Sequence, residues 1–439
     1  MNDDLSLKIK EKLGENRLFY VCRDIERAEG LCEYFNLNIY IITNQSPYSL
    51  KLKQEYPNNI ILIDNGRILD THELLVLYHF EENKEFGDID PRKVYPDFTS
   101  KLKMTIQPND FVMVFKNTKK IENLCQKNNW RLLNPPAELA SFVEEKISQI
   151  EWLGELKKYL PGYEIKQMKE IEFTKEPFII QFNHSHTGSG TTLIKSKEDL
   201  EKLKKEFPNR LARIARYING PLLTNNNVVW GDKILMGNIS YQITGLKPFT
   251  NREFATIGND WSLGKNFLND KQISEYQKIV NDIGQKLTEQ KWKGLFGVDI
   301  VLEQETGKLY LLEINARQPA STSYESWLQT TNSKQQQDNN SKITTIDAHM
   351  AALLEIPYNN EELIKINNGA QIVLRKSQEP KIKNQETVIA KLQANGYKLI
   401  QYDNGKEEAD WLRIQSQNGI MKEHNQFNEF GEQILNSIS

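Results

Sequence analysis

Along this sequence, short apolar runs alternate with segments of helical spacing over the first third, and antiparallel strand signals replace them further on. In the first third the pattern predicts strands at residues 17–24, 38–43, 59–64, 110–115 and 130–134, with helices at 25–36, 71–80 and 119–129. Strands that alternate with helices predict a parallel α/β sheet. Prolines at 135 and 136 break the pattern, so the first domain is predicted to end at residue 134.

An amphipathic segment follows over residues 137–162, and its spacing predicts one helix or a pair of helices. Lys146 falls in the middle of this segment, where a solvated lysine on the helix surface is the plainest interpretation. No GxGxxG follows the first strand, at residues 17–24, so the dinucleotide-binding fingerprint is absent.

A loop rich in glycine and hydroxyl residues follows the predicted strand 176–182, which contains Gln181. The small residues of this loop are Gly188, Ser189, Gly190 and Thr191. Backbone N–H groups and hydroxyls in such a loop can donate to phosphate oxygens, although a plain hairpin turn explains it equally well. It is not a Walker A loop, because no Gly-Lys-Ser/Thr follows. His184 and His186 lack a third metal ligand nearby, which argues against a metal pair.

Residues 210–292 carry antiparallel signals. A strand is predicted at 210–220, a hairpin at 226–244 and a helix at 273–292, while 251–267 is irregular. Further on, the polar stretch 330–342 is predicted to be a mobile excursion.

The most informative stretch is a predicted hairpin at residues 294–317, which is apolar except for Asp299, Glu313, Asn315 and Arg317. Packing gives such strands little reason to carry these residues, because buried carboxylates without partners are costly. Two carboxylates and an amide oxygen are hard ligands of the kind that Mg²⁺ takes beside nucleotide phosphates. An edge hairpin with solvated charges is the alternative.

Loop length tests this interpretation, because side chains alternate along a strand. A three-residue loop ending in glycine makes Gln304 face Lys308. Counting outward, Asp299 then faces Glu313, and Asn315 shares that face. A two-residue loop would put the two carboxylates on opposite faces.

Composition narrows the function classes. The 439 residues suffice for two or three domains, and a net charge of −3 gives no sign of a nucleic-acid or membrane partner. No apolar run approaches the roughly 20 residues needed to span a bilayer, and the N-terminus lacks an apolar signal region. Cys22, Cys32 and Cys125 form no CxxC pair or metal spacing, so a reducing, cytoplasmic location is expected.

Taken in order, these pieces resemble the ATP-grasp ligase superfamily over residues 17–377. The resemblance rests on NPPAELASFVEEK at the end of the lead domain, IIQFNHSHTGSGT, IARYING, the hairpin GVDIVL…YLLEINAR and the late strand GAQIVLR. It implies an α/β and α+β multidomain protein, with a Rossmann-like pre-ATP-grasp domain before a two-lobed ATP-grasp fold. The expected domains are 1–134 (pre-ATP-grasp), 135–222 (lid subdomain with linking helices), 223–377 (catalytic core with the metal hairpin) and 378–439 (a small C-terminal α/β segment).

The resemblance also implies residue roles. ATP would lie between two lobes, and Asp299, Glu313 and Asn315 would hold one or two Mg²⁺ ions, or Mn²⁺. The nucleotide contacts would come from Lys146, from Gly188, Ser189, Gly190 and Thr191 in the lid, and from the main chain of Arg216 and Ile218 at the adenine edge. Arg317 would contact phosphate and the developing acyl-phosphate, and Arg375 would reach the substrate or the tetrahedral intermediate.

Gln181 departs from the family pattern, because many members carry a lysine there. Glutamine can donate a hydrogen bond but carries no charge. Either Lys195 or Arg213 supplies the cation, or phosphate binding is weaker. Gln181, the Gly-Thr end of the lid and the Ser240-Tyr-Gln242 sequence are similar to a branch of peptide and amino-acid ligases with a pre-ATP-grasp domain.

The implied activity is ATP-dependent carboxylate–amine ligation, which forms an amide or peptide bond through an acyl-phosphate and releases ADP and phosphate. The partners would be a small carboxylate and a small amine, which the sequence does not name. A biotin-carboxylase-like activity is disfavoured, because the lid lacks the glycine-rich pattern of that group. A nucleotide-binding regulatory protein without turnover is kept open by Gln181. Oligomeric state is open, with a homodimer as the commonest choice.

Overall fold

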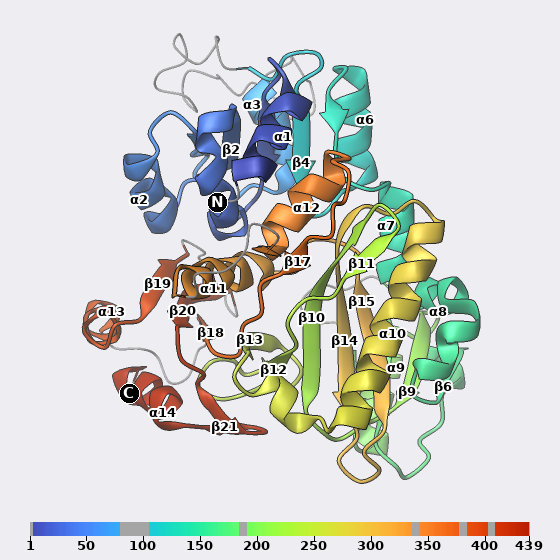
Figure 1. The fold of residues 1–439 in the computed structure, drawn as a ribbon. Helices are drawn as coiled ribbons and strands as arrows, with labels where there is room; N and C mark the ends of the chain where they lie inside the picture. The colour runs from blue at the N-terminus through green and yellow to red at the C-terminus, as the bar shows by residue number, and fades with distance from the viewer. Residues whose placement is uncertain are drawn as a thin grey trace.

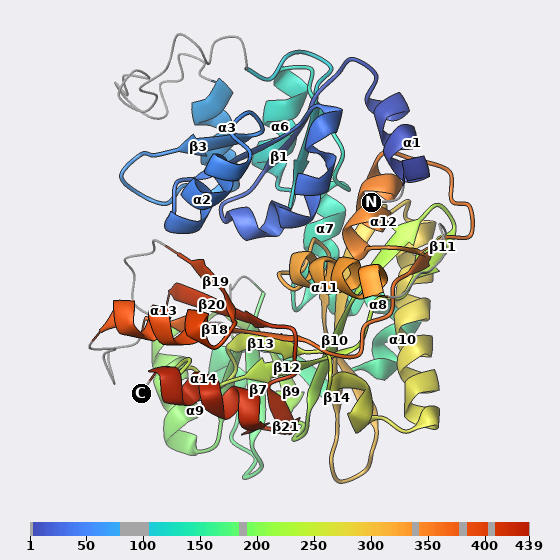
Figure 2. The ribbon, with the colours of Figure 1, turned by 60° about the vertical axis from the view of Figure 1, so that its left-hand side comes forward.

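The computed structural model describes residues 3–79, 105–183, 191–335, 342–376, 384–402 and 409–438. Figure 1 shows the N-terminal domain, in blue to cyan, above a larger β-rich body, with the C-terminal segment in red beneath that domain. Figure 2 shows the same segment still below the N-terminal domain after the turn.

The lead domain is a parallel five-stranded sheet in the order β3-β2-β1-β4-β5. The strands are β1 (Leu18–Val21), β2 (Ile39–Asn44), β3 (Ile60–Ile63), β4 (Phe111–Val114) and β5 (Arg131–Leu132). The helices are α1 (Asp3–Leu13), η1 (Ile25–Leu37), α2 (Pro47–Glu55), α3 (Thr71–His79) and α6 (Lys119–Lys127). The predicted parallel sheet is therefore confirmed. The helix expected at 25–36 is a 3-10 helix, while α1 and α2 were not predicted.

The amphipathic segment after the lead domain is interrupted at Lys146. It forms α7 (Ala137–Glu144), α8 (Ser148–Leu153) and η3 (Gly154–Tyr159). The side chain of Asn183 holds the break, because its Oδ1 accepts from the N–H of Ile147 at 2.9 Å and its Nδ2 donates to Glu145 at 2.5 Å. Of the two predicted arrangements, the pair of helices is the one that forms. Lys146 lies in the break between them and not within a helix, since these hydrogen bonds replace the helical ones.

The next unit is a four-stranded sheet in the order β6-β9-β7-β8. Its elements are β6 (Tyr163–Gln167), η4 (Met168–Glu170), β7 (Phe178–Phe182), β8 (Thr191–Ile194), α9 (Lys197–Glu206) and β9 (Leu211–Arg216). One face buries Phe178, Ile180 and Phe182 together with Leu200 of α9. Because side chains alternate along a strand, Gln181 lies on the opposite face. We call this unit the lid sheet.

A nine-stranded sheet forms the larger body, in the order β15-β14-β10-β12-β13-β18-β20-β19 with β11 beside β10. Its first strands are β10 (Leu222–Trp230), β11 (Lys233–Leu235), β12 (Ser240–Thr244) and β13 (Thr256–Asp260). The others are β14 (Gly294–Leu302), β15 (Leu309–Asn315), β18 (Ala370–Arg375), β19 (Lys398–Gln401) and β20 (Asp410–Ser416). Strand β13 lies in the segment expected to be irregular, 251–267, because its pairing with β12 and β18 overrides a weak local pattern.

Helices cover this sheet on its two faces. They are η5 (Gly264–Phe267), α10 (Asp270–Glu289), α11 (Thr322–Gln335) and α12 (Thr345–Leu353), with the short pair β16 (Lys342–Ile343) and β17 (Glu362–Leu363) nearby. Helix α10 packs Ile279 and Ile283 against Val298 and Leu311. Helix α12 contributes Ile346 and Met350 to the core shared with the lead domain. Helix α11 includes the first residues of the predicted excursion 330–342, and residues 336–341 lie outside the described ranges.

The C-terminal segment completes the large sheet. Its remaining elements are α13 (Gln385–Ala394), β21 (Met421–Glu423), β22 (Gln426–Phe427) and α14 (Glu429–Ile438). Strand β20 pairs with β18 along its length, and Lys398 of β19 pairs with Glu29 of the lead domain at 2.6 Å. No helix in the described part of the chain combines the length and hydropathy required to cross a bilayer.

The register of the β14–β15 hairpin agrees with one prediction and corrects another. Asp299 is paired with Glu313, as predicted. Near the loop, however, the N–H of Glu303 donates to the carbonyl of Lys308, so the loop holds four residues, 304–307, and Gln304 does not face Lys308. A bulge after Asp299 inserts one extra residue, Leu312, and restores the predicted pairing.

Candidate active site

Two carboxylates face each other where β14 and β15 pair. Asp299 Oδ1 accepts from the hydroxyl of Thr224 at 2.6 Å, and Oδ2 accepts from the amide Nδ2 of Asn315 at 3.2 Å. Burial, with the charge of Glu313 as the second cause, raises the pKa of Asp299 to about 6. These side chains are brought together by register alone, since Asp299, Glu313 and Asn315 share one face of the hairpin.

Lys146 reaches this pair from the break between α7 and α8. Its ammonium lies 2.7 Å from Oε1 of Glu313, and the lysine side chain is 12% exposed. The non-helical backbone between the two helices, held by Asn183, therefore delivers the cation to the carboxylates. The interpretation of Lys146 as a solvated surface residue is wrong.

Arg317 is positioned by a second ion-pair group. Glu144, at the end of α7, forms two ion pairs. Its Oε1 lies 2.9 Å from Nε of Arg317, and its Oε2 lies 2.8 Å from the ammonium of Lys116. Burial opposes ionisation of Glu144, but Arg317 and then Lys116 keep the pKa of that carboxyl below its usual value. Glu144 thus remains charged and fixes the arginine beside the hairpin.

The lid sheet presents a row of polar side chains. Gln181 pairs with Thr191 on β8 and with Arg213 on β9, and its Nε2 donates to the Thr191 hydroxyl at 3.3 Å. Lys195 instead forms an exposed ion pair with Glu253 at 3.0 Å. The predicted lid residues Gly188, Ser189 and Gly190 lie outside the described ranges.

Arg216 and Ile218 lie where the lid sheet joins the large sheet. The N–H of Arg216 donates to the carbonyl of Gly162 at 2.9 Å, and its guanidinium pairs with Glu303 at 2.5 Å and donates to the Tyr310 hydroxyl at 2.8 Å. Ile218 is buried against Tyr310. Arg216 ends β9 and Ile218 follows it, so both lie in the junction between the two sheets.

Residues 143–321, which contain every group above except Lys116, match the family described as the ATP-grasp domain. This region is an ATP-grasp domain. Solved structures align with this region, with the lead domain before it and with the C-terminal segment after it, so the similarity in fold covers nearly the whole chain.

Three solved structures illustrate the shared fold. N5-carboxyaminoimidazole synthetase from Staphylococcus aureus complexed with ADP aligns with a TM-score of 0.61 at 13% identity, covering 96% of this chain and 97% of that chain. L-amino acid ligase from Bacillus licheniformis aligns with a TM-score of 0.59 at 11% identity, covering 96% and 97%. Biotin carboxylase from Campylobacter jejuni aligns with a TM-score of 0.57 at 12% identity, covering 92% and 88%. No curated protein sequence matches this chain significantly.

The ATP-grasp hairpin offers a donor set that fits a hard divalent cation. Asp299 and Glu313 supply carboxylate oxygens. The Nδ2 of Asn315 donates a hydrogen bond to Asp299, which leaves the side-chain carbonyl oxygen of Asn315 available as a metal ligand. Two neighbouring carboxylates, one of them buried with a raised pKa, would be neutralised by such a cation. Within the described ranges, no three His, Cys, Asp or Glu side chains lie together as a metal site. A metal bound by Asp299 and Glu313 would therefore take its third protein ligand from the amide oxygen of Asn315.

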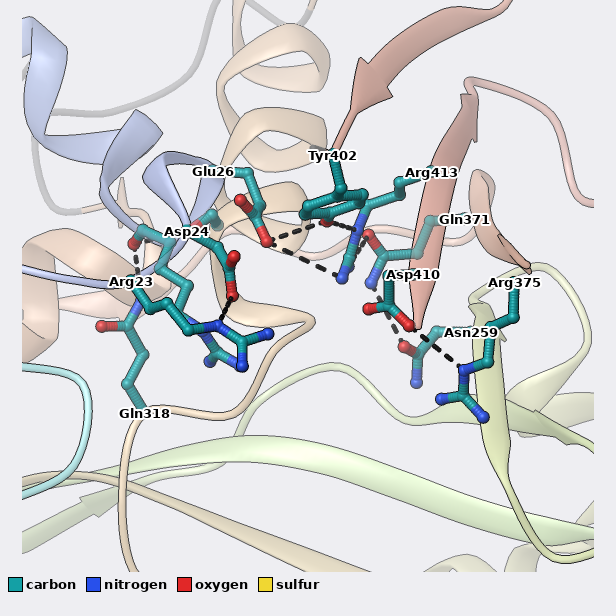
Figure 3. A network of polar contacts seen from close by, with 12 residues as sticks. Arg23, Asp24, Glu26, Asn259, Gln318, Gln371, Arg375, Tyr402, Asp410 and Arg413 are labelled. Atoms are coloured by element: carbon teal, nitrogen blue, oxygen red, sulfur yellow. Dashed lines mark hydrogen bonds and ion pairs between the residues drawn. The ribbon is translucent and has the colours of Figure 1, made fainter. Parts of the chain in front are cut away.

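Arg375, predicted to reach the substrate, has a different environment. Its Nε pairs with Asp410 of β20 at 3.1 Å, and its Nη2 donates to the carbonyl of Thr256 at 3.0 Å. Figure 3 shows this ion pair beside a polar network that reaches Glu26 of the lead domain. In the described ranges, the side-chain hydrogen bonds of Arg375 go to β20 and β13, and none reaches the hairpin of the ATP-grasp domain.

The network in Figure 3 was not predicted from sequence. The Tyr402 hydroxyl donates to Glu26 at 2.8 Å and accepts from Nε of Arg413 at 2.8 Å, while Nη1 of Arg413 donates to Gln371 at 3.1 Å. Burial, and then the charge of Asp24, raise the pKa of Glu26 to about 7. A signal was present, since Gln371 and Arg413 each stand between apolar residues of their strands.

A small cavity of about 20 Å³ lies beside this network, lined by residues that include Arg23, Asp24, Asn44 and Tyr402. It lies at the carboxyl ends of β1 and β2, the edge at which open parallel sheets bind ligands. Lys116 follows β4 in the same way, across the point where the strand order changes from β1 to β4. The position of Lys116 could therefore have been recognised from the predicted strand order.

Proposed function

We propose that this protein is an ATP-dependent carboxylate–amine ligase that forms an amide or peptide bond and releases ADP and phosphate. The observation that carries the proposal is the pairing of Asp299 with Glu313 inside an ATP-grasp domain, with Lys146 2.7 Å from Glu313. Solved relatives in fold include an L-amino acid ligase and an ADP complex of a carboxyaminoimidazole synthetase, which supports nucleotide-dependent ligation.

The reaction needs no nucleophile from the protein. An oxygen of the substrate carboxylate attacks the γ-phosphorus in line, the bond from that phosphorus to the β-γ bridging oxygen breaks, and ADP leaves. The amine then attacks the acyl carbon, a proton passes to solvent, and the carbon–oxygen bond to phosphate breaks. A carboxylate is a weak nucleophile, so positioning and exclusion of water are the main contributions of the protein.

The chain supplies the charges for this chemistry. Mg²⁺ held by Asp299, Glu313 and Asn315 would neutralise charge on the phosphates. Arg317, fixed by Glu144, would stabilise the negative charge that develops on the transferred group. The ammonium of Lys146, which lies 2.7 Å from Oε1 of Glu313, would bind a phosphate oxygen beside the metal site.

A regulatory nucleotide-binding protein is the second candidate, and Gln181 favours it because a neutral side chain stands on the lid sheet at the position usually held by lysine. The carboxylate pair argues against it, since nucleotide binding without turnover places little demand on two neighbouring carboxylates. These two functions predict different products, so one assay separates them.

The test is turnover of Mg-ATP with pooled amino acids and small carboxylates, including bicarbonate. The ligase proposal expects release of ADP and phosphate that depends on the pool, with an amide product detected by mass spectrometry. Release of AMP would contradict the acyl-phosphate mechanism. Turnover that depends on bicarbonate and biotin would favour the biotin-carboxylase-like alternative. ATP binding without turnover in any pool would favour the regulatory one.

A further inference from the structure

Arg213 is a buried cation on the lid sheet. It lies in the middle of β9, pairs with Gln181 on β7, and is 1% exposed. Its neighbours Ala212 and Ile214 pack into the core beneath α9. Because side chains alternate along the strand, Arg213 points away from that core, on the same face as Gln181.

The guanidinium of Arg213 is poorly satisfied. Within the described ranges, its Nε and Nη1 have no hydrogen-bond partner. Its nearest aromatic contact is the ring of Tyr163, whose centroid lies 5.9 Å away. Burial lowers the pKa of Arg213 to about 10, and Glu313 on the metal hairpin is among the groups that oppose this fall. Arg213 thus stays charged at neutral pH and lies within electrostatic range of Glu313.

A buried charge without hydrogen-bonded partners costs folding free energy, so this position is unfavourable for a purely structural residue. The N–H groups on Nε and Nη1, which have no partner in the described ranges, can instead donate hydrogen bonds to an anion. Arginine suits phosphate oxygens, because its N–H groups lie in one plane and can bind two oxygens at once. The neighbouring Gln181 can add a hydrogen bond but no charge.

The other candidate cation, Lys195, is less suitable. Its side chain is 59% exposed and its ammonium pairs with Glu253 at 3.0 Å. An exposed, already paired lysine gains little by binding phosphate in competition with water and Glu253. Of the two residues named by the sequence as sources of the missing charge, only Arg213 is buried beside Gln181.

We propose that Arg213 binds the polyphosphate of the nucleotide and so replaces, from the neighbouring strand, the positive charge absent at position 181. The inference rests on the proposed nucleotide-dependent function. Strand β9 would then hold a phosphate-binding side chain, Arg213, a few residues before Arg216 and Ile218, whose main chain is proposed to contact adenine.

The experiment compares binding of ATP, ADP and adenosine to the full chain by calorimetry in Mg²⁺, together with the thermal midpoint of the free protein. Arg213→Met should weaken ATP and ADP binding by about 10- to 100-fold, the range of a charge-assisted hydrogen bond, and leave adenosine binding unchanged. The free variant should melt at the same temperature or higher, because an uncompensated buried charge is removed. Lys195→Met, the matched control, should change neither quantity.

A double variant tests whether a positive charge on β7 can replace the one on β9. Gln181→Lys combined with Arg213→Met should recover most of the lost ATP affinity. An Arg213→Met variant that binds ATP as the wild type does would overturn the proposal. So would equal losses for adenosine and ATP, or a lowered melting temperature with no recovery in the double variant. If the wild type itself binds no ATP, the proposed function fails together with this inference, whereas the other outcomes overturn the inference alone.

Discussion

The ammonium of Lys146 lies 2.7 Å from Oε1 of Glu313, joining the break after α7 to the strand that carries the proposed metal ligands. In the free protein this contact neutralises a carboxylate that faces another carboxylate, that of Asp299. A lysine in this place would compete with a divalent cation when no nucleotide is bound, and would cooperate with it once phosphates are present.

Replacement of Lys146 should therefore change two affinities in opposite directions. Lys146→Met should bind Mg²⁺ alone roughly fivefold more tightly, as expected for loss of one partly exposed ion pair, and should bind Mg-ATP more weakly. Calorimetric titration with each ligand measures both. Lys293→Met, which removes an exposed pair with Glu355, is the control. Affinities that move together would contradict the competition.

Glu313→Gln should lower the kcat of the ligase reaction by a factor of about 100 or more. This is the order of the loss seen when a group that stabilises transition-state charge is removed. The fold should be retained, because Glu313 is only half-buried. Turnover is measured by substrate-dependent ADP release, and the melting temperature reports the fold. Glu355→Gln should behave as the wild type. A fully active Glu313→Gln protein would refute the proposed metal site.

Glu144→Gln should lower kcat about tenfold and leave the KM for ATP less affected. Without the carboxylate, Arg317 and Lys116 repel each other and the arginine loses its fixed position. The matched control is Glu138→Gln, an exposed residue of the same helix. Steady-state kinetics at several ATP concentrations separate the two constants. An unchanged kcat would show that Glu144 does not position Arg317.

Stability should fall in mild acid because of His349, which is buried in α12. Its Nδ1 accepts from the N–H of Leu295 at 3.1 Å, and burial lowers its pKa to about 3. Between that value and the unfolded value of about 6.5, the unfolded chain binds more protons, so stability decreases as pH falls. The cost is roughly 1.4 kcal/mol per pH unit in this window.

His349→Asn removes the titrating ring and keeps an acceptor for the N–H of Leu295. The variant should be less stable than the wild type at pH 7.5, because it leaves space in the core, and this difference should shrink as the pH falls to 5. Melting temperatures across the pH series provide the measurement. A difference that stays constant would exclude His349 as the source.

The sequence predicted the parallel lead sheet from short apolar runs that alternate with helices, and the pairing of Asp299 with Glu313 from the alternation of side chains along each strand. It did not predict the bulge at Leu312. The predicted three-residue loop was one residue too short, and the bulge compensates for that error. A bulge leaves no distinct local pattern in an apolar strand, so only the pairing reveals it.

Long-range hydrogen bonds explain the other errors. The break at Lys146 depends on Asn183, which lies 36 residues from Ile147 in sequence. The surroundings of Arg375 depend on Asp410, 35 residues further along. Helical periodicity reports only which residues can share a face, so it is insensitive to a distant side chain that replaces a helical hydrogen bond.

Strand β20 has a consequence for the order in which the chain folds during synthesis. Until residues 410–416 leave the ribosome, β18 has β13 on one side and an open edge on the other. An unpaired apolar edge can pair with other chains, so the nascent protein carries an aggregation hazard until late in translation. The strand that closes this edge also carries Arg413 and Asp410, so protection of the sheet and completion of the polar network occur together.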